Sequence, residues 1–485
     1  MSSPARLQGT VVLVNPNRMK PPVAPLALDY LASALAQAGF QVEVLDLCFS
    51  EDAERDIRDF FQSKDVLAVA FTIRNTDDAY FASRDNFIPQ FKDNIDLIRR
   101  HTDAPVILGG AGFSVMPEAI LRYCGLDFGV WGEGEHALPV LVERMSGGMD
   151  YEDVPGLVYR HGSELQANSP AFLDLASIPA PARDAIDNRR YFVEGGMGCI
   201  ETKRGCDRGC IYCADPVGKG RQIRLRSPDS VADEIETLLG MGIDHLHLCD
   251  SEFNVPREHA VGVCEALVRR GLGEKVRWYT YASPGGFDRE VAWLCRQAGC
   301  AGINFGVDSG CARMLRGLGR DFTVADVQRA AEACREAGIT TMYDLLLGGP
   351  GETRESLRET IETVKRISPD RIGISLGVRI YPGTRLASQV KGQGPLGDNP
   401  NLHGAVSGND GFVEPAFYLS AELGEDAPDY VAELIGGDER FFFASPSEVE
   451  QNYNYNENTV LVNAIREGYR GAFWDILRRL HEAKG

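Results

Sequence analysis

Long apolar runs are absent from this chain of 485 residues. No stretch reaches the roughly 20 apolar residues of a membrane-spanning helix, and the opening MSSPARLQGT lacks an apolar leader, so we expect a cytoplasmic protein with no membrane partner. Positive charge is also scarce, with 50 Lys and Arg against 70 Asp and Glu and a net charge of −20. Because phosphate binding needs a basic surface, this balance argues against a nucleic-acid partner.

Cysteine is not scarce, but it is unevenly placed. The chain has 12 cysteines and none after Cys334, and in a chain of cytosolic appearance cysteines favour metal binding or catalysis over disulfides. Only Cys206, Cys210 and Cys213 have metal-ligand spacing, C-x3-C-x2-C, with Tyr212 just before the third. An iron–sulfur cube normally takes four thiolates. Three on one short loop therefore predict a [4Fe–4S] cluster with one iron open to a substrate.

The remaining thiols offer one alternative, a second cluster built from Cys295, Cys300 and Cys311. Cys295, however, shares the apolar face of an expected helix with Val291 and Leu294. An inert buried thiol is the commoner outcome at such a position. We therefore expect a single cluster.

Residues 8–146 alternate short apolar strands with helical stretches. Strands are expected at 11–15, 42–47, 66–72, 105–110 and 127–132. They are continuously apolar and rich in β-branched residues, as strands covered on both faces are. Five such units predict an α/β fold over residues 1–150, a doubly wound, flavodoxin-like parallel sheet that binds ligands at the carboxyl ends of its strands.

A connector follows at residues 151–194, with a hairpin expected at 156–168 and a proline-rich linker after it. Residues 195–390 then alternate strands and helices again. Strands are expected at about 198–203 and at 243–249, 276–282, 302–308, 340–348 and 371–381. Six units predict a partial (β/α)6 barrel whose active site lies at the carboxyl ends of its strands.

Residues 391–485 are less regular and predict a small, mostly helical C-terminal domain. We expect this domain to cap the substrate site. The polar and aromatic segment around Tyr453 and Tyr455 is the candidate for the roof.

The loop CDRGCIYC (206–213) resembles the cluster loop of the radical S-adenosylmethionine (SAM) superfamily, in which the open iron holds the amino and carboxylate groups of SAM. Four further segments fit the same family, each at the end of an expected barrel strand: DSEFN (250–254), GVDSG (306–310), LLGGPGET (346–353) and RIYPGT (379–384). The resemblance implies a SAM site made of Tyr212, Glu252 at the amino group, Asp308 and Ser309 at the ribose and carboxylate, Gly349 and Pro350 near the adenine, and Arg379 at the carboxylate.

The doubly wound domain before such a barrel resembles the cobalamin-binding domain of the B12-dependent radical SAM enzymes. The resemblance covers nearly the first 390 residues and depends on NPN (15–17), TIRN (72–75), GGAGFSVMPEA (109–119) and GEGE (132–135). It implies cobalamin contacts from Asn15, Arg74, Asn75, Gly109, Gly110, Gly132 and Gly134. The glycines would let the nucleotide tail of cobalamin lie against the backbone.

One departure concerns the lower face of the cobalt. Many B12 proteins supply a histidine there from an Asp-x-His-x-x-Gly loop, and this chain has no such loop. We therefore expect no histidine on cobalt. Arg74 is expected near the lower face instead, where a cation without a lone pair disfavours a further ligand; a plain surface salt bridge is the competing role.

The resemblance implies a cobalamin-dependent radical SAM methyltransferase (class B). It would move a methyl group from SAM, by way of cobalamin, to a carbon of a small-molecule biosynthetic substrate, with flavodoxin or ferredoxin as the source of electrons. Three alternatives stay open. The same cofactors serve cyclisation, ring rearrangement or polar methylation without a 5′-deoxyadenosyl radical. A methylthiotransferase would need cluster cysteines in its first domain, which holds only Cys48 and Cys124. A cobalamin carrier with a relic barrel would not need Glu252 or the cluster cysteines. The motifs do not specify the substrate.

Overall fold

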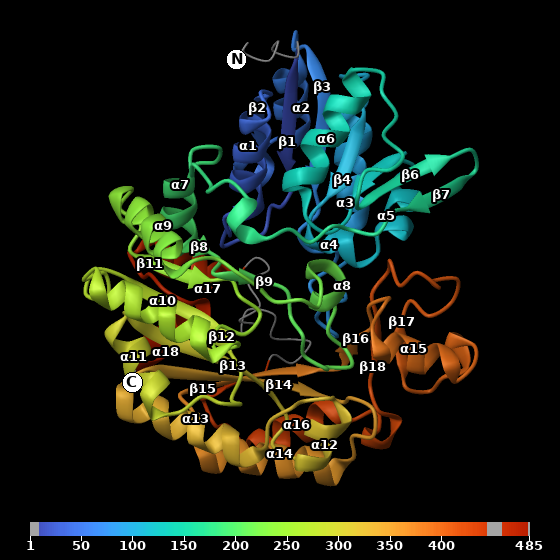
Figure 1. Ribbon diagram of the computed structural model, residues 1–485. Helices are drawn as coiled ribbons and strands as arrows, with labels where there is room; N and C mark the ends of the chain where they lie inside the picture. Colours follow the sequence, from blue (N-terminus) through green and yellow to red (C-terminus); the bar gives the residue numbers. More distant parts are fainter. Residues whose placement is uncertain (1–8, 444–457, 484–485) are drawn as a thin grey trace.

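The computed structural model describes residues 9–443 and 458–483. Its two largest sheets have seven strands each and are mainly parallel, and the N-terminal sheet lies above the barrel sheet in Figure 1. In this part of the chain no helix is long and apolar enough to cross a membrane.

The N-terminal sheet has the order β2-β1-β3-β4-β5-β6-β7. Its strands are β1 (Thr10–Asn15), β2 (Gln41–Asp46), β3 (Val66–Thr72), β4 (Val106–Gly109), β5 (Phe128–Val130), β6 (Leu157–His161) and β7 (Glu164–Ala167). The first five are parallel, which confirms the doubly wound prediction. The hairpin β6–β7 was expected in the connector, but it pairs antiparallel with β5 and extends this sheet.

Both faces of this sheet are covered, as its continuously apolar strands require. One face packs on α1 (Leu26–Gln37) and α6 (Gly134–Ser146). The other packs on α2 (Ala53–Phe61), α3 (Ile88–Ile98) and α5 (Pro117–Cys124). The short helix α4 (Ala111–Val115) follows β4 at the carboxyl edge of the sheet. α7 (Asn188–Gly195) leads into the barrel.

The barrel sheet has the order β19-β15-β14-β13-β12-β11-β8 and does not close. Its strands are β8 (Gly198–Ile200), β11 (His245–Leu248), β12 (Arg277–Ala282), β13 (Cys300–Asp308), β14 (Thr340–Leu347), β15 (Arg371–Leu376) and the edge strand β19 (Phe441–Phe442). Outside it lie α9 (Pro228–Gly240), α10 (Arg257–Arg269), α11 (Arg289–Gln297), α12 (Ala312–Gly317), α13 (Val324–Ala337) and α14 (Arg354–Ile367). The side chains of Ser227 and Thr323 cap the first turns of α9 and α13. The large core lies between these helices and the strands.

The sixth expected strand, 371–381, is two strands. The chain bends at Gly377, which has a φ of +89°, a conformation that favours glycine. β15 stays in the barrel, and β16 (Val378–Arg379) leaves it to pair with β18 (Ala416–Tyr418). β17 (Leu402–Gly404) completes this separate three-stranded sheet. Arg379 therefore does not lie in the barrel wall.

The described part of the C-terminal block does not form one cap. α15 (Arg385–Gly392) packs with the three-stranded sheet, and α16 (Ala427–Ile435) packs on α14. α17 (Thr459–Arg466) and α18 (Phe473–Glu482) lie at the opposite end of the barrel from the cysteine loop, where Trp474 packs on Tyr279 and Met342. Tyr453 and Tyr455 lie outside the described residues, so the substrate-capping role stays a prediction.

Candidate active site

The cysteine loop follows β9 (Lys203–Arg204), which pairs with β10 (Arg224–Leu225), and ends at α8 (Asp215–Lys219). Neighbouring segments fix the loop backbone. The N–H of Ile211 donates to the carbonyl of Leu318 at 3.0 Å, and the N–H of Leu386 donates to the carbonyl of Ile211 at 2.8 Å. The loop thus lies between the segment after α12 and the start of α15.

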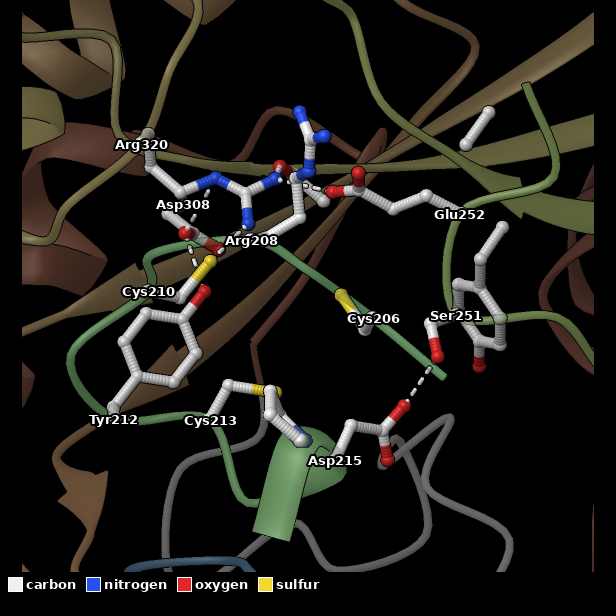
Figure 2. Close-up of a pocket in the computed structure, with 14 residues that line it drawn as sticks. Cys206, Arg208, Cys210, Tyr212, Cys213, Asp215, Ser251, Glu252, Asp308 and Arg320 are labelled. Carbon is white, nitrogen blue, oxygen red and sulfur yellow. Dashed lines mark hydrogen bonds and ion pairs between the residues drawn. The ribbon is translucent and has the colours of Figure 1, made fainter. Parts of the chain in front are cut away.

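A cavity of about 130 Å³ opens over this loop (Figure 2). Cys206, Cys210 and Cys213 all face it, together with Glu252 from the loop after β11 and Asp308 from the end of β13. The other lining residues are Arg208, Tyr212, Asp215, Pro216, Ser251, Tyr281, Ala282, Gly306 and Arg320. The fold therefore brings three thiols and three carboxylates, those of Asp215, Glu252 and Asp308, to one cavity.

Arg320 connects the groups around this cavity. Its Nη1 donates to Sγ of Cys210 at 2.8 Å, and its Nη2 donates to Oε1 of Glu252 at 3.1 Å. Its Nε lies 3.3 Å from Oδ2 of Asp308, and that oxygen also accepts from the hydroxyl of Tyr212 at 2.5 Å. One guanidinium thus contacts a cluster cysteine and the carboxylates of Glu252 and Asp308.

Burial raises the pKa of the Glu252 and Asp308 carboxyls, and the nearby Arg320 opposes that rise in both. Burial likewise raises the pKa of the thiols of Cys206, Cys210 and Cys213. Uncompensated thiolates are therefore unfavourable in this cavity. A cationic cluster that takes them as ligands would remove that cost.

The cavity fits a four-iron cluster better than a single ion. Among the described residues no three His, Cys, Asp or Glu side chains converge on one metal position. In an iron–sulfur cube each thiolate binds a different iron, so its ligands stand apart. Oε2 of Glu252 is buried and accepts no hydrogen bond from the described residues, which leaves an acceptor beside the cysteines for a cationic group.

At the edge of the upper sheet, Arg74 follows β3 and faces the barrel. Its charge lies near His247 and Cys249, and it reinforces the effect of burial in lowering the pKa of His247 to about 4. Arg74 forms no ion pair with any residue in 9–443 or 458–483. The competing role for this residue, a surface salt bridge, therefore has no partner in that part of the chain.

The glycine loop after β4 packs directly against the backbone of Arg74. A Cβ on Gly112 would lie 3.0 Å from the carbonyl oxygen of Arg74, and one on Gly110 would lie 2.6 Å from that of Ile73. The same loop begins α4, which packs on α8, the helix that directly follows the cysteine loop. The segment of Arg74 and the cysteine loop are thus connected through two short helices (Figure 1).

Comparison with known proteins agrees with both halves of this arrangement. Residues 200–364 match the radical SAM superfamily, and residues 16–142 match the B12 binding domain. The tryptophan 2-C-methyltransferase of Streptomyces laurentii is 32% identical, over 96% of this chain and 95% of that protein.

Two solved structures of the radical SAM methyltransferase TsrM from Kitasatospora setae are similar over nearly the whole chain. The one with tryptophan and a SAM analogue has a TM-score of 0.90 at 32% identity, over 99% of this chain and 100% of that one. The one with cobalamin and a [4Fe–4S] cluster has a TM-score of 0.87 at 31% identity, over 98% and 99%.

The chain belongs to the cobalamin-dependent radical SAM methyltransferases. Its cofactors are those of the family: a [4Fe–4S] cluster, SAM and cobalamin. The cobalamin-binding domain and the cluster-binding barrel are the two sheets of Figure 1.

Within this family's site, the structure brings together six of the residues expected around the cluster and SAM: Cys206, Cys210, Tyr212, Cys213, Glu252 and Asp308. Asp308 has a φ of +60°, uncommon for a residue other than glycine, and this turns its carboxylate at the end of β13.

The other expected SAM residues do not line the cavity. Ser309 is fully buried, and its hydroxyl contacts Thr360 at 2.7 Å and accepts from the N–H of Cys311 at 3.1 Å, so its position has a structural reason. Gly349 packs against Leu318. Its SAM role, and that of Pro350, stay predictions for a wider site.

Arg379 differs most clearly from its expected surroundings. It was expected at the SAM carboxylate, but its guanidinium donates to the carboxylate of Asp77 in the cobalamin-binding domain. The bend at Gly377 is the physical reason, because it carries Arg379 out of the barrel wall.

The expected cobalamin residues divide into two groups. Asn15 is 2% exposed, and its amide donates to Asp46 and to Tyr191, so it is engaged within the protein. A Cβ on Gly132 would lie 2.8 Å from Cβ of Pro170, and one on Gly134 would lie 2.9 Å from Leu31, so packing alone explains both glycines.

Arg74, Asn75, Gly109 and Gly110, by contrast, lie together where β3 and β4 end, at the edge that faces the barrel. Their contacts with cobalamin stay predictions.

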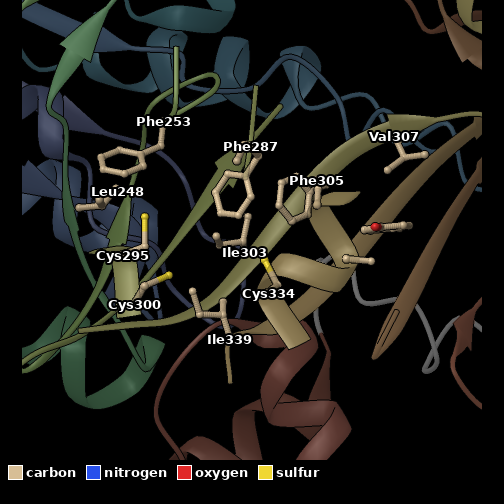
Figure 3. Close-up of a cluster of buried hydrophobic side chains, with 14 of the residues drawn as sticks. Leu248, Phe253, Phe287, Cys295, Cys300, Ile303, Phe305, Val307, Cys334 and Ile339 are labelled. Atoms are coloured by element: carbon tan, nitrogen blue, oxygen red, sulfur yellow. The ribbon is translucent and has the colours of Figure 1, made fainter. Parts of the chain in front are cut away.

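Cys295, Cys300 and Cys334 lie in the barrel core (Figure 3). Cys295, Cys300 and Cys334 are at most 1% exposed, and Cys264 lies 3.8 Å from Cys295, sulfur to sulfur. Burial keeps the pKa of Cys300 and Cys334 well above that of an ordinary thiol. Cys300 and Cys334 are therefore protonated packing groups, and the structure gives no support to the alternative of a second cluster.

Sequence reasoning missed Arg320 and Asp77. Arg320 follows the GVDSG segment in the run GLGRDF, where an arginine between glycine and aspartate has the appearance of a surface turn. Asp77 lies two residues beyond TIRN. The role of each residue depends on partners that are distant in the sequence, and a local sequence pattern does not show such partners.

Proposed function

We propose that this methyltransferase acts on a ring carbon of a small aromatic amino acid, with tryptophan as the first candidate. The similarity to a tryptophan 2-C-methyltransferase over 96% of the chain supports this substrate class. So does the TM-score of 0.90 to a structure that contains tryptophan.

The observation that carries the proposal is an aromatic wall inside the barrel. Tyr281 on β12 lines the cavity above the cysteine loop and is 41% exposed. His247 on the neighbouring strand β11 packs edge to face against it, with ring centroids 5.3 Å apart. An indole ring would gain a similar contact with this pair.

A buried acceptor lies beside that wall. Asn304 on β13 pairs in register with Tyr281, and its Nδ2 donates to Oδ2 of Asp344 at 2.7 Å. Its Oδ1 is buried and accepts no hydrogen bond from the described residues. An indole N–H donates and cannot accept, so it would satisfy this atom.

The residues of the chain divide the remaining work. When bound, the cluster and cobalamin supply the electron and methyl-transfer chemistry. Cys206, Cys210 and Cys213 would hold the cluster, and the unpaired Oε2 of Glu252 would accept from the amino group of SAM. Arg320 would keep the charge of the cysteines and carboxylates balanced.

We also propose a cytoplasmic location and a small electron-transfer protein such as flavodoxin or ferredoxin as reductant. The 12 cysteines are all free thiols in the structure, as expected in a reducing compartment. The cysteine loop has exposed backbone at Gly209, next to Cys210, where a reductant could approach.

A substrate panel tests the proposal. The full chain, reconstituted without oxygen, is incubated with SAM labelled in its methyl group and with tryptophan, ring-substituted tryptophans, tyrosine or histidine. We expect label on a ring carbon of tryptophan or a close analogue. Labelled product from none of these amino acids would contradict the substrate class, and an unmethylated cyclised or rearranged product would favour the other chemistry of these cofactors.

A further inference from the structure

A buried ion pair joins the cobalamin-binding domain to the C-terminal sheet. Arg379 on β16 donates to Oδ2 of Asp77 from Nε at 3.1 Å and from Nη2 at 2.9 Å. The side chains are 3% and 0% exposed. In the sequence they are 302 residues apart. No other ion pair links the β3–α3 loop to the C-terminal block among the described residues.

The pair has one fixed geometry because its other atoms are also engaged. Oδ1 of Asp77 accepts from the N–H of Ala79 at 2.9 Å and from the hydroxyl of Tyr381 at 3.3 Å. Nη2 of Arg379 also donates to the carbonyl of Phe412 at 2.9 Å. Removing either partner would leave a buried charge uncompensated.

This pair holds one end of the segment that carries Arg74 and Asn75. Asp77 lies three residues after Arg74. On the other side, Gly112 approaches the Arg74 carbonyl so closely that a Cβ would lie 3.0 Å from it. The backbone of Arg74 is therefore fixed between the glycine loop and the ion pair, while its guanidinium forms no ion pair with the described residues.

We propose that Asp77 and Arg379 are positioning residues for cobalamin: they hold the Arg74–Asn75 segment in place and make its position depend on the C-terminal sheet. The inference rests on cobalamin binding at this segment, which the sequence predicts. Neither residue needs to touch the cofactor.

A purely structural clamp is the rival explanation, and the interface offers a reason to consider it. Phe81 of the same loop packs against His403 and Phe417, with ring centroids 5.6 Å away in each case. If the ion pair served only to hold the domains together, its loss would lower stability and leave the cobalamin environment unchanged.

The experiment compares Arg379→Gln, Asp77→Asn, the double variant and the conservative Arg379→Lys in the full chain. The matched control is Arg371→Gln. Arg371 is also a buried arginine, 6% exposed, on the preceding strand β15, and it forms no ion pair with the described residues. Thermal unfolding without cobalamin gives the structural effect. Cobalamin affinity and the EPR spectrum of bound cob(II)alamin give the effect on the site.

We expect Arg379→Gln and Asp77→Asn each to weaken cobalamin binding about tenfold, which corresponds to about 1.4 kcal/mol, and to change the EPR spectrum. Arg379→Lys should weaken cobalamin binding by an intermediate amount. The double variant should weaken it by less than the sum of the two single variants, because it leaves no uncompensated charge. Arg371→Gln should lower stability with affinity and spectrum unchanged.

The inference would be overturned if Arg379→Gln and Asp77→Asn both had the cobalamin affinity and EPR spectrum of the wild type. It would also be overturned if Arg371→Gln changed the affinity and the spectrum as much as they do. If the glutamine variant does not fold, Arg379→Lys and Asp77→Asn decide alone. Failure of the proposed function looks different: the unaltered protein would then bind cobalamin with the expected dependence on this pair but methylate no aromatic amino acid.

Discussion

The cluster cavity differs in its construction from the edge of the upper sheet where Arg74, Asn75, Gly109 and Gly110 lie, which we call the cobalamin edge. At the cluster, charged side chains from four separate segments converge, and Arg320 contacts Cys210, Glu252 and Asp308. At the cobalamin edge, backbone meets backbone at Gly110 and Gly112, and the guanidinium of Arg74 has no ion-pair partner among the described residues.

The difference follows from what each cofactor needs. A cluster is held by thiolates, so its site depends on the identity of a few side chains. Cobalamin is large, and its nucleotide tail can lie along backbone where no Cβ intervenes. Substitutions should therefore act by lost chemistry at the cluster and by changed shape at the cobalamin edge.

The largest expected effect is at a cluster ligand. Cys210→Ala should abolish SAM cleavage and methyl transfer, because the cluster loses one of three thiolate ligands. Iron content and the EPR spectrum of the reduced protein measure the loss. Cys295→Ala is the control, since this core thiol lies away from the cavity. A Cys210→Ala protein with a full cluster and normal activity would contradict the role of Cys210 as a cluster ligand.

Arg320→Gln should have the next largest effect. Its loss removes a hydrogen bond to a cluster sulfur and leaves the Glu252 and Asp308 carboxylates without their cation. We expect activity to fall about 10- to 100-fold, as for other partners of metal ligands, and the reduction potential of the cluster to become more negative. Arg313→Gln, an exposed arginine that donates to the carbonyl of Gly351, should change neither.

At the cobalamin edge, shape should decide. Gly112→Ala places a methyl group 3.0 Å from the Arg74 carbonyl, whereas Gly240→Ala, at the end of α9, meets no other atom within 4 Å. Gly112→Ala should therefore weaken cobalamin binding several-fold, and Gly240→Ala should not. Titration of the apoprotein with cobalamin, followed by its absorption spectrum, distinguishes them. Equal affinities would show that the backbone of Arg74 does not position the cofactor.

The smallest expected effect concerns the aromatic wall. Tyr281→Ala should raise the KM for the aromatic substrate about 2- to 10-fold, the size of one aromatic contact, and Tyr281→Phe should keep most of the binding. Tyr123, 40% exposed on α5 and away from the cavity, provides the control. An unchanged KM in Tyr281→Ala would place the substrate ring elsewhere.

The sequence predicts the fold well because strand patterns are local. Apolar β-branched runs mark the five parallel strands of the upper sheet, and capping residues mark helix starts at Ser227 and Thr323. The exception, 371–381, shows the limit: the run has apolar residues on both sides of Gly377, and that single glycine divides it between two sheets through its φ.

The site is predicted in part, for a related reason. The cysteine spacing is a local pattern and identifies its residues directly. The partner of Arg379 is not local, because the carboxylate that it binds, that of Asp77, lies 302 residues away in the chain. Asn15 likewise follows its strand as expected, but its amide is used by Asp46 and Tyr191.

The most direct test of the account uses SAM with a deuterated methyl group and tryptophan, with the reconstituted protein prepared with and without cobalamin. Mass spectrometry then locates the label. The account predicts a deuterated methyl group on a ring carbon only when both the cluster and cobalamin are present. A label on a heteroatom, or carbon methylation that persists without cobalamin, would contradict it.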